Sequence, residues 1–195
     1  MSGIAAMRTL RPPYLWHLAD DRVFLRAPAI EDSGEFLARV RDSRGLHHPW
    51  VTPPASPDTF AAYVARASTA EFQGFLICRR SDGALVGVAN LSQIARGLLQ
   101  SAYLGYYGFV PFVRQGYITE GVGQVVSRAF GALALHRVEA NVQPENLPSK
   151  AVVQRLGFRL EGFSPRYLKI AGRWRDHERW AMLSDEWRGR ESPQG

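Results

Sequence analysis

Phe109 to Gly121 read FVPFVRQGYITEG, and the interpretation of the whole chain starts from this stretch. The aromatic run from Tyr103 to Phe109 predicts a strand, and a helical pattern begins at about Thr119. A short basic loop that contains Gly116 joins the two. Such a loop leaves backbone N–H groups unpaired beside the positive end of a helix dipole. The pattern therefore predicts a phosphate-binding loop; the alternative is an ordinary turn in which Gly116 serves only the backbone.

Composition indicates a single globular domain, because the chain has 195 residues of which 46% are hydrophobic. Cys78 is the one cysteine and lies in an apolar run, so we expect a core residue, no disulfide and a reducing cytoplasm. No apolar run reaches the roughly 20 residues that span a bilayer, and the first seven residues lack a secretory pattern. The net charge of +6 permits a negatively charged partner, either ribosomal RNA or a phosphorylated cofactor, and requires neither.

The periodicity predicts a mixed α+β domain over residues 1–195, with helices on both faces of one sheet. Residues 1–21 form a loosely ordered lead-in, and residues 184–195 form a polar, mobile tail. Strands are expected at 22–26, 72–79, 85–94, 100–109, 137–142, 158–168 and 174–183, and helices at 31–41, 56–68, 119–134 and 150–156.

Two polar or aromatic positions stand out before the central stretch. Trp50 lies in a proline-rich loop and forms either a lid over the core or a wall of a substrate pocket. Asn90 lies in an apolar strand, so its amide either ties down backbone or faces a ligand. His47 and His48 have no third ligand at a usable spacing, so no metal site is predicted.

Five motifs follow one another along the chain: Leu85–Asn90, Tyr103–Tyr106, Arg114–Glu120, Asn146–Phe158 and Tyr167–His177. In this order they resemble the GNAT acyltransferase superfamily, and within it the ribosomal-protein-alanine N-acetyltransferases, the RimJ/RimL group, closest to the RimJ type. The resemblance covers about residues 20–183. The resemblance implies a mixed, mostly antiparallel sheet of six to seven strands that splays between the fourth and fifth strands.

The resemblance also implies that acetyl-CoA lies in that splay, with its pyrophosphate on the loop before the helix. The family pattern there is Q/R-x-x-G-x-G/A, and this chain departs from it at Val113 and Ile118 and matches at Gly116. The pantetheine amides are expected to pair with the fourth strand as an added strand would. The residues implied to bind acetyl-CoA are Tyr107, Phe109, Arg114, Gln115, Gly116, Tyr117, Ile118, Thr119, Asn146 and Ser149.

Catalytic roles follow from the same resemblance. A backbone N–H at Gly108 or Phe109 serves the oxyanion, and Ser149 hydrogen-bonds the leaving sulfur, unless Ser149 is only a helix N-cap. The position of the usual tyrosine acid is Val153. Glu161, His177 or a water chain are alternatives for the base. Trp50, Asn90 and Tyr106 are expected in the acceptor pocket, with core packing as the alternative for Trp50 and Tyr106.

The expected activity is acetyl transfer to the N-terminal α-amine of a protein or peptide, because an α-amine has a pKa near 8 and a lysine amine one near 10.4. The expected partner is then the N-terminus of a protein or peptide, for instance of a ribosomal protein. No membrane partner is expected, and direct binding of nucleic acid is not required. The enzyme is expected in the cytoplasm as a monomer or homodimer. The alternatives are acetylation of a small amine, such as an amino acid, a polyamine or an antibiotic, and a non-catalytic acyl-CoA-binding or ribosome-associated module.

Overall fold

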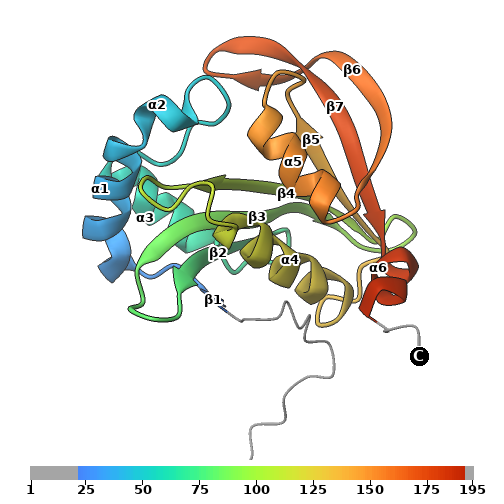
Figure 1. The fold of residues 1–195 in the computed structure, drawn as a ribbon, viewed down its shortest axis with the longest axis horizontal. Coiled ribbons are helices and arrows are strands. Elements are labelled where there is room, and N and C mark those ends of the chain that lie inside the picture. Colours follow the sequence, from blue (N-terminus) through green and yellow to red (C-terminus); the bar gives the residue numbers. More distant parts are fainter. Residues whose placement is uncertain (1–21, 192–195) are drawn as a thin grey trace, which may run out of the picture.

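The computed structural model describes residues 22–191 and shows one seven-stranded sheet in the order β1-β2-β3-β4-β5-β7-β6 (Figure 1). All neighbouring strands are antiparallel except β4 and β5, which are parallel. The strands are β1 (Val23–Arg26), β2 (Phe72–Arg79), β3 (Leu85–Ala95), β4 (Ser101–Gly108), β5 (Arg137–Val142), β6 (Arg159–Ile170) and β7 (Arg173–Leu183).

Within residues 22–191 there are six α-helices and one 3-10 helix, of which all but the C-terminal one lie between strands (Figure 1). They are η1 (Ile30–Asp32), α1 (Ser33–Asp42), α2 (Arg44–His47), α3 (Pro57–Arg66), α4 (Tyr117–Phe130), α5 (Leu147–Arg155) and α6 (Ser184–Glu191). The structure confirms the predicted mixed α+β fold, and β2 and β5 have the bounds expected from sequence. The short helix α2 lies where a loop was expected, and α4 and α5 begin two and three residues before their expected starts.

Helices α3 and α4 cover opposite faces of the sheet. A Cβ on Gly74 of β2 would meet Tyr63 of α3, whereas a Cβ on Gly121 of α4 would meet Ile77 of β2. Residues 74 and 77 are an odd number apart on one strand, so they point to opposite faces. We call these the α3 face and the α4 face; α5 lies with α4, because its Lys150 bonds Glu178 on that side.

The α4 face holds much of the apolar core. Along β5, Val138, Ala140 and Val142 are buried and alternate with partly exposed residues. The helix α4 buries Val122, Val125, Val126 and Ala129. Because each buried aliphatic side chain contributes about 1.5–3 kcal/mol, this face fixes where α4 lies and therefore where the loop before it is held.

The expectation of a mobile polar tail from Ser184 is wrong for the residues up to 191, which form α6. Trp187 is buried, and its indole N–H donates to Ser127 Oγ of α4 at 3.0 Å. One aromatic side chain therefore anchors a segment whose sequence is otherwise polar. The predicted lead-in, residues 1–21, lies outside the described residues. Within the described range, no helix has the length and apolar character needed to cross a bilayer.

Candidate functional site

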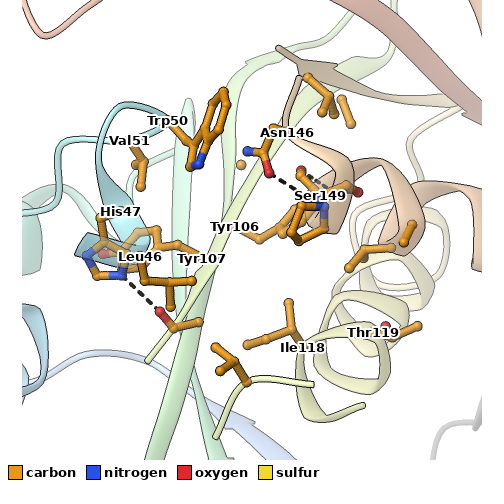
Figure 2. Close-up of a pocket in the computed structure, with 18 of the residues that line it drawn as sticks. Leu46, His47, Trp50, Val51, Tyr106, Tyr107, Ile118, Thr119, Asn146 and Ser149 are labelled. Atoms are coloured by element: carbon orange, nitrogen blue, oxygen red, sulfur yellow. Dashed lines mark hydrogen bonds between the residues drawn. The ribbon is translucent and has the colours of Figure 1, made fainter. Parts of the chain in front are cut away.

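The parallel strands β4 and β5 pair over a short length and then diverge. Their register runs from Ser101 opposite Arg137 to Tyr103 opposite Glu139, and no pairing of the two strands continues beyond that point within residues 22–191. A cavity of about 570 Å³ lies at this gap and is lined by both strands, the loop before α4, the start of α5 and the α2 region (Figure 2). The predicted splay is therefore present, and it is an open site.

The hydrogen-bond pattern between β4 and β3 determines which backbone groups of β4 face the gap. Gly108 lies opposite Gly87 of β3, and the Phe109 N–H donates to Val86 O at 3.0 Å. Successive residues of an antiparallel strand direct their N–H and C=O groups to alternate edges. The backbone groups of Leu104, Tyr106 and Gly108 consequently face the gap, and those of Tyr107 and Phe109 face β3.

This hydrogen-bond pattern shows that part of the predicted cofactor site is wrong. The Phe109 N–H is already paired, its side chain is fully buried, and Phe109 is not among the cavity-lining residues. It therefore cannot serve as an oxyanion donor or a strand partner for pantetheine. Tyr107 does line the cavity, but with its side chain on the α3 face, where its ring contacts His47.

The loop before α4 has the backbone geometry of an anion site. Arg114 and Gly116 have φ values of 63° and 86°, in the left-handed region, and a Cβ on Gly116 would lie 3.0 Å from Arg22 Nη2. Gly116 is the N-cap of α4 and provides no side chain to pair with the helix. Within the described residues, the N–H groups of residues 113–119 find no protein acceptor. These donors remain available to a phosphate at the helix N-terminus.

Arg22 and Glu120 hold this loop against the edge of the sheet. The buried Glu120 carboxylate accepts from the Val23 N–H at 2.9 Å and from Arg22 Nε at 3.2 Å. Arg22 also donates to Gln115 O at 3.1 Å, and its guanidinium lies over the Tyr117 ring. The donors of the loop are therefore oriented before any ligand arrives. Sequence reasoning gave Arg22 and Glu120 no such role, since the contact joins residues almost a hundred positions apart.

The start of α5 borders the gap on the α4 face. Asn146 is the N-cap of α5, and its Oδ1 accepts from the Ser149 N–H at 3.2 Å. The alternative reading of Ser149 as the N-cap is therefore wrong. Ser149 Oγ donates to the Tyr106 hydroxyl at 2.9 Å, and that hydroxyl donates to Ser149 O at 2.8 Å (Figure 2). Burial raises the pKa of Tyr106, so its hydroxyl stays protonated.

The α3 face contributes a different set of groups to the same cavity. His47 Nε2 donates to Gly108 O at 2.9 Å, and Gln143 Nε2 donates to Trp50 O at 3.3 Å. Asn141 of β5 also lines the cavity, and its buried Oδ1 has no partner within residues 22–191. Figure 2 shows His47 and Trp50 across the gap from Asn146 and Ser149. The cavity therefore passes through the sheet from one face to the other.

Most of the residues predicted for the site come together around this cavity. Those that line it are Trp50, Tyr106, Tyr107, Gly108, Arg114, Gly116, Ile118, Thr119, Asn146 and Ser149. Those that do not are Asn90, Phe109, Gln115 and Tyr117. The Gln115 amide donates to Pro111 O, so it shapes the loop. The Asn90 Oδ1 accepts from the Tyr63 hydroxyl at 2.9 Å, so the structure does not bring Asn90 into the acceptor pocket.

The two candidate bases differ sharply. Glu161 does not line the cavity, and ion pairs with Arg137 and Arg159 lower its pKa to about 2, so it is a poor proton acceptor at neutral pH. His177 of β7 lines the cavity and is buried. Its Nδ1 donates to Arg175 O at 3.0 Å, which leaves Nε2 as the basic nitrogen. Burial lowers the pKa of His177, so the imidazole is neutral at pH 7.

Metal chemistry receives no support from side-chain positions. Among the described residues, no three His, Cys, Asp or Glu side chains lie close enough together to hold a metal ion. His47 uses Nε2 for Gly108 O, and its Nδ1 is buried.

Comparison with known proteins identifies the family. Residues 22–159 match the family described as acetyltransferase (GNAT) domain. A probable N-acetyltransferase of Bacillus subtilis, YjcK, is 41% identical over 84% of this chain and 95% of its own length. The ribosomal protein uS5-alanine N-acetyltransferase of Escherichia coli is 28% identical over 87% of this chain and 92% of its own.

Solved structures agree with these relatives. Mycobacterium smegmatis RimJ in complex with CoA-disulfide has a TM-score of 0.78 and 30% identity, over 84% of this chain and 83% of that one. A spermidine N-acetyltransferase of Vibrio cholerae has a TM-score of 0.73 at 20% identity, over 86% of this chain and 99% of that one, which shows a shared fold only. The chain belongs to the GNAT acetyltransferase family and is an acyltransferase whose co-substrate is acetyl-CoA.

The site fits acetyl-CoA on its own geometry. Open N–H donors precede α4, a Cβ at Gly116 would crowd the Arg22 guanidinium, and the gap-facing edge of β4 offers the backbone groups that an extended pantetheine needs.

Gly116→Glu should therefore weaken coenzyme A binding at least about tenfold, or about 1.4 kcal/mol, because the new carboxylate repels phosphate and its Cβ crowds Arg22. Calorimetric titration with coenzyme A measures the change. Gly97→Glu is the matched control, since Gly97 also has positive φ but has open space around it. Both variants carry the backbone strain of a left-handed non-glycine residue, about 1–2 kcal/mol. Equal affinity in the two variants would remove this loop from the cofactor site.

Proposed function

We propose that this protein acetylates the N-terminal α-amine of a protein or peptide, as enzymes of the ribosomal-protein-alanine type do. The observation that carries the proposal is the cavity that passes through the sheet. An acyl donor held by α4 and α5 on one face can then meet an amine that enters from the α3 face. The relatives named as ribosomal-protein-alanine acetyltransferase and RimJ support the same choice of acceptor.

The lining of the cavity favours an α-amine over a polycation. None of the described residues that line it is Asp or Glu. A polyamine has several positive charges that would be buried without partners, at a cost of several kcal/mol each. An N-terminal α-amine has a single charge and loses it near pH 8. The likeness to spermidine N-acetyltransferases concerns the fold, and this acid-free lining weighs against their substrate here.

The residues divide the chemistry between the two faces. Acetyl-CoA supplies a thioester whose acyl carbon is attacked by the neutral amine. The Gly108 N–H, which faces the gap, stabilises negative charge that develops on the acyl oxygen. Ser149 Oγ provides a hydrogen-bond donor for the departing sulfur once its hydroxyl rotates away from Tyr106, and the Tyr106 hydroxyl, which donates to Ser149 O, holds this residue in place. Val153, at the position of the usual acid, is fully buried and has no proton to give.

His177 is our assignment for the base. It lines the cavity through β7, on the α3 face, where the amine would enter. Its Nδ1–H is fixed by Arg175 O, so its orientation and tautomer are set. The acceptor is expected to be a protein in the cytoplasm, where ribosomal proteins are made.

A panel of acceptors with acetyl-CoA tests the proposal directly. Peptides that begin with Ala or Ser should release thiol from acetyl-CoA faster than spermidine or free lysine at pH 7, because a peptide α-amine is neutral more often than a polyamine or lysine side-chain amine and brings no further charge into the acid-free cavity. The measurement is the initial rate of thiol release for each acceptor. Faster turnover of spermidine than of every peptide would assign the enzyme to small amines instead.

Ser149→Ala should lower kcat by about 10²-fold or more, the size that a positioned proton donor contributes, and leave coenzyme A affinity nearly unchanged. Stability should also change little, since Asn146 and not Ser149 caps α5. Asn146→Ala is the control and should lower the free energy of unfolding by about 1 kcal/mol. If Ser149→Ala lost stability and activity together, the hydroxyl would have only a structural role.

His177→Asn should remove the low-pH limb of the kcat profile, because the wild-type imidazole accepts a proton only above its lowered pKa and loses that ability as the pH falls through it. Asparagine keeps a donor for Arg175 O, so folding should be preserved. The measurement is kcat against pH at saturating peptide, with the melting temperature as control. An unchanged low-pH limb in the variant would exclude His177 as the base.

A further inference from the structure

Three arginines of β7 project from the same side of the sheet as the cavity-lining His177. Arg173, Arg175, His177 and Arg179 are two residues apart in turn, and alternate residues of a strand share a face. Arg179 lies directly opposite Asn141 of β5, which lines the cavity. This basic row, Arg173 with Arg175 and Arg179, therefore starts at the cavity and extends about 20 Å along β7.

Within residues 22–191 the basic row has no ion-pair partner. Arg175 Nε is buried without a hydrogen-bond partner in that part of the chain. Arg173 and Arg179 are exposed, so an incoming anionic group can reach them.

Nearby acids do not compensate this charge. On the same face, Glu139 and Glu161 are both engaged by Arg137, and Glu161 also by Arg159. The acids of β7 itself lie on the other face, where Glu178 pairs with Lys150. Asp176, also on that side, accepts the Arg166 N–H. The strand thus separates its charges, with acids toward α5 and arginines toward the side from which the acceptor would enter.

Resting on the proposed function, we infer that the basic row binds acidic side chains of the acceptor peptide downstream of its N-terminal residue. Alternate residues of an extended peptide project to one side about 7 Å apart, which is the spacing of Arg173 and Arg175, and Arg179 lies about twice that distance from Arg175. Guanidinium groups bind carboxylates with paired hydrogen bonds. The α-amine can then reach the gap while carboxylates farther along the peptide lie over β7. The acceptor is accordingly a protein whose N-terminal segment is acidic.

Three peptides that begin with the same Ala residue test this inference. They carry Glu, Gln or Lys at positions 3, 5 and 7 and are otherwise identical. At low salt, kcat/KM should fall from Glu to Gln to Lys, by roughly threefold for each exposed contact, and the order should collapse toward equality in 0.5 M salt because screening shortens the reach of charge. If no peptide is acetylated, the proposed function fails. If all three are acetylated equally at low salt, the function stands and the basic row has no part in it.

Charge reversal identifies the arginines responsible. Arg173→Glu combined with Arg179→Glu should reverse the preference, so that the Lys peptide becomes the better substrate. Arg41→Glu combined with Arg66→Glu makes the same change of net charge at exposed positions of α1 and α3 and should keep the original order. The single variant Arg179→Gln, expected to fold normally, should lower the Glu-to-Lys ratio by roughly threefold. An unaltered ratio there would overturn the inference.

Nucleic acid is the competing partner for a basic surface, and the same variants separate it. The anisotropy of a labelled single-stranded RNA measures binding to the wild type and to the doubly reversed variant. RNA binding lost in that variant, together with equal turnover of the three peptides, would assign the basic row to nucleic acid and overturn the inference.

Discussion

Parallel pairing between β4 and β5 lasts for three residue pairs, and the remaining structure of the site depends on where it stops. Beyond Tyr103 and Glu139 the strands part, so the gap-facing backbone of β4 has no strand partner within the described chain. Unpaired backbone groups in a sheet are costly unless something occupies them. Two contacts span the opening and hold its width, Tyr106 to Ser149 on the α4 face and Gln143 to Trp50 on the α3 face. The gap is thus maintained by specific contacts of the folded chain.

This geometry separates the two reactants by sheet face. Groups suited to phosphate and to the leaving sulfur lie with α4 and α5, and His47, Trp50, Asn141 and His177 lie on the other side. In the proposed reaction each reactant therefore binds to its own face, and the two would meet in the gap between β4 and β5. Holding two reactants in one orientation is itself a large part of catalysis. The arginines of β7 extend the second face outward, so selection of the acceptor would involve peptide residues beyond the one that reacts.

Sequence patterns predicted the fold and the strand–loop–helix arrangement around Gly116 well, because strand alternation and the loop-to-helix transition are local features. They could not show which residues of each strand point to which face of the sheet. Tyr106 was expected in the acceptor pocket, and its side chain lies beside Ser149 on the α4 face. Tyr107, expected to bind acetyl-CoA, lies on the α3 face instead. Strand alternation shows that Tyr106 and Tyr107 point to opposite faces of the sheet. It does not show which face each one takes, because helices cover both faces of β4 and both faces are therefore apolar. Asn90 was misplaced for a similar reason, since its partner Tyr63 comes from a helix 27 positions earlier.

His47 has no proposed part in the reaction itself, but its imidazole determines which backbone group of Gly108 is free to bind a ligand. Its Nε2 donates to Gly108 O, and burial lowers its pKa, so it remains neutral at pH 7. A strand residue directs its N–H and C=O to the same edge, so Gly108 would otherwise offer the gap both a donor and an acceptor. With the carbonyl already engaged, only the N–H is left for a ligand. In the proposed reaction, the acyl oxygen would need a donor at that place. His47 therefore makes the end of β4 a donor site without adding a charge next to the incoming amine.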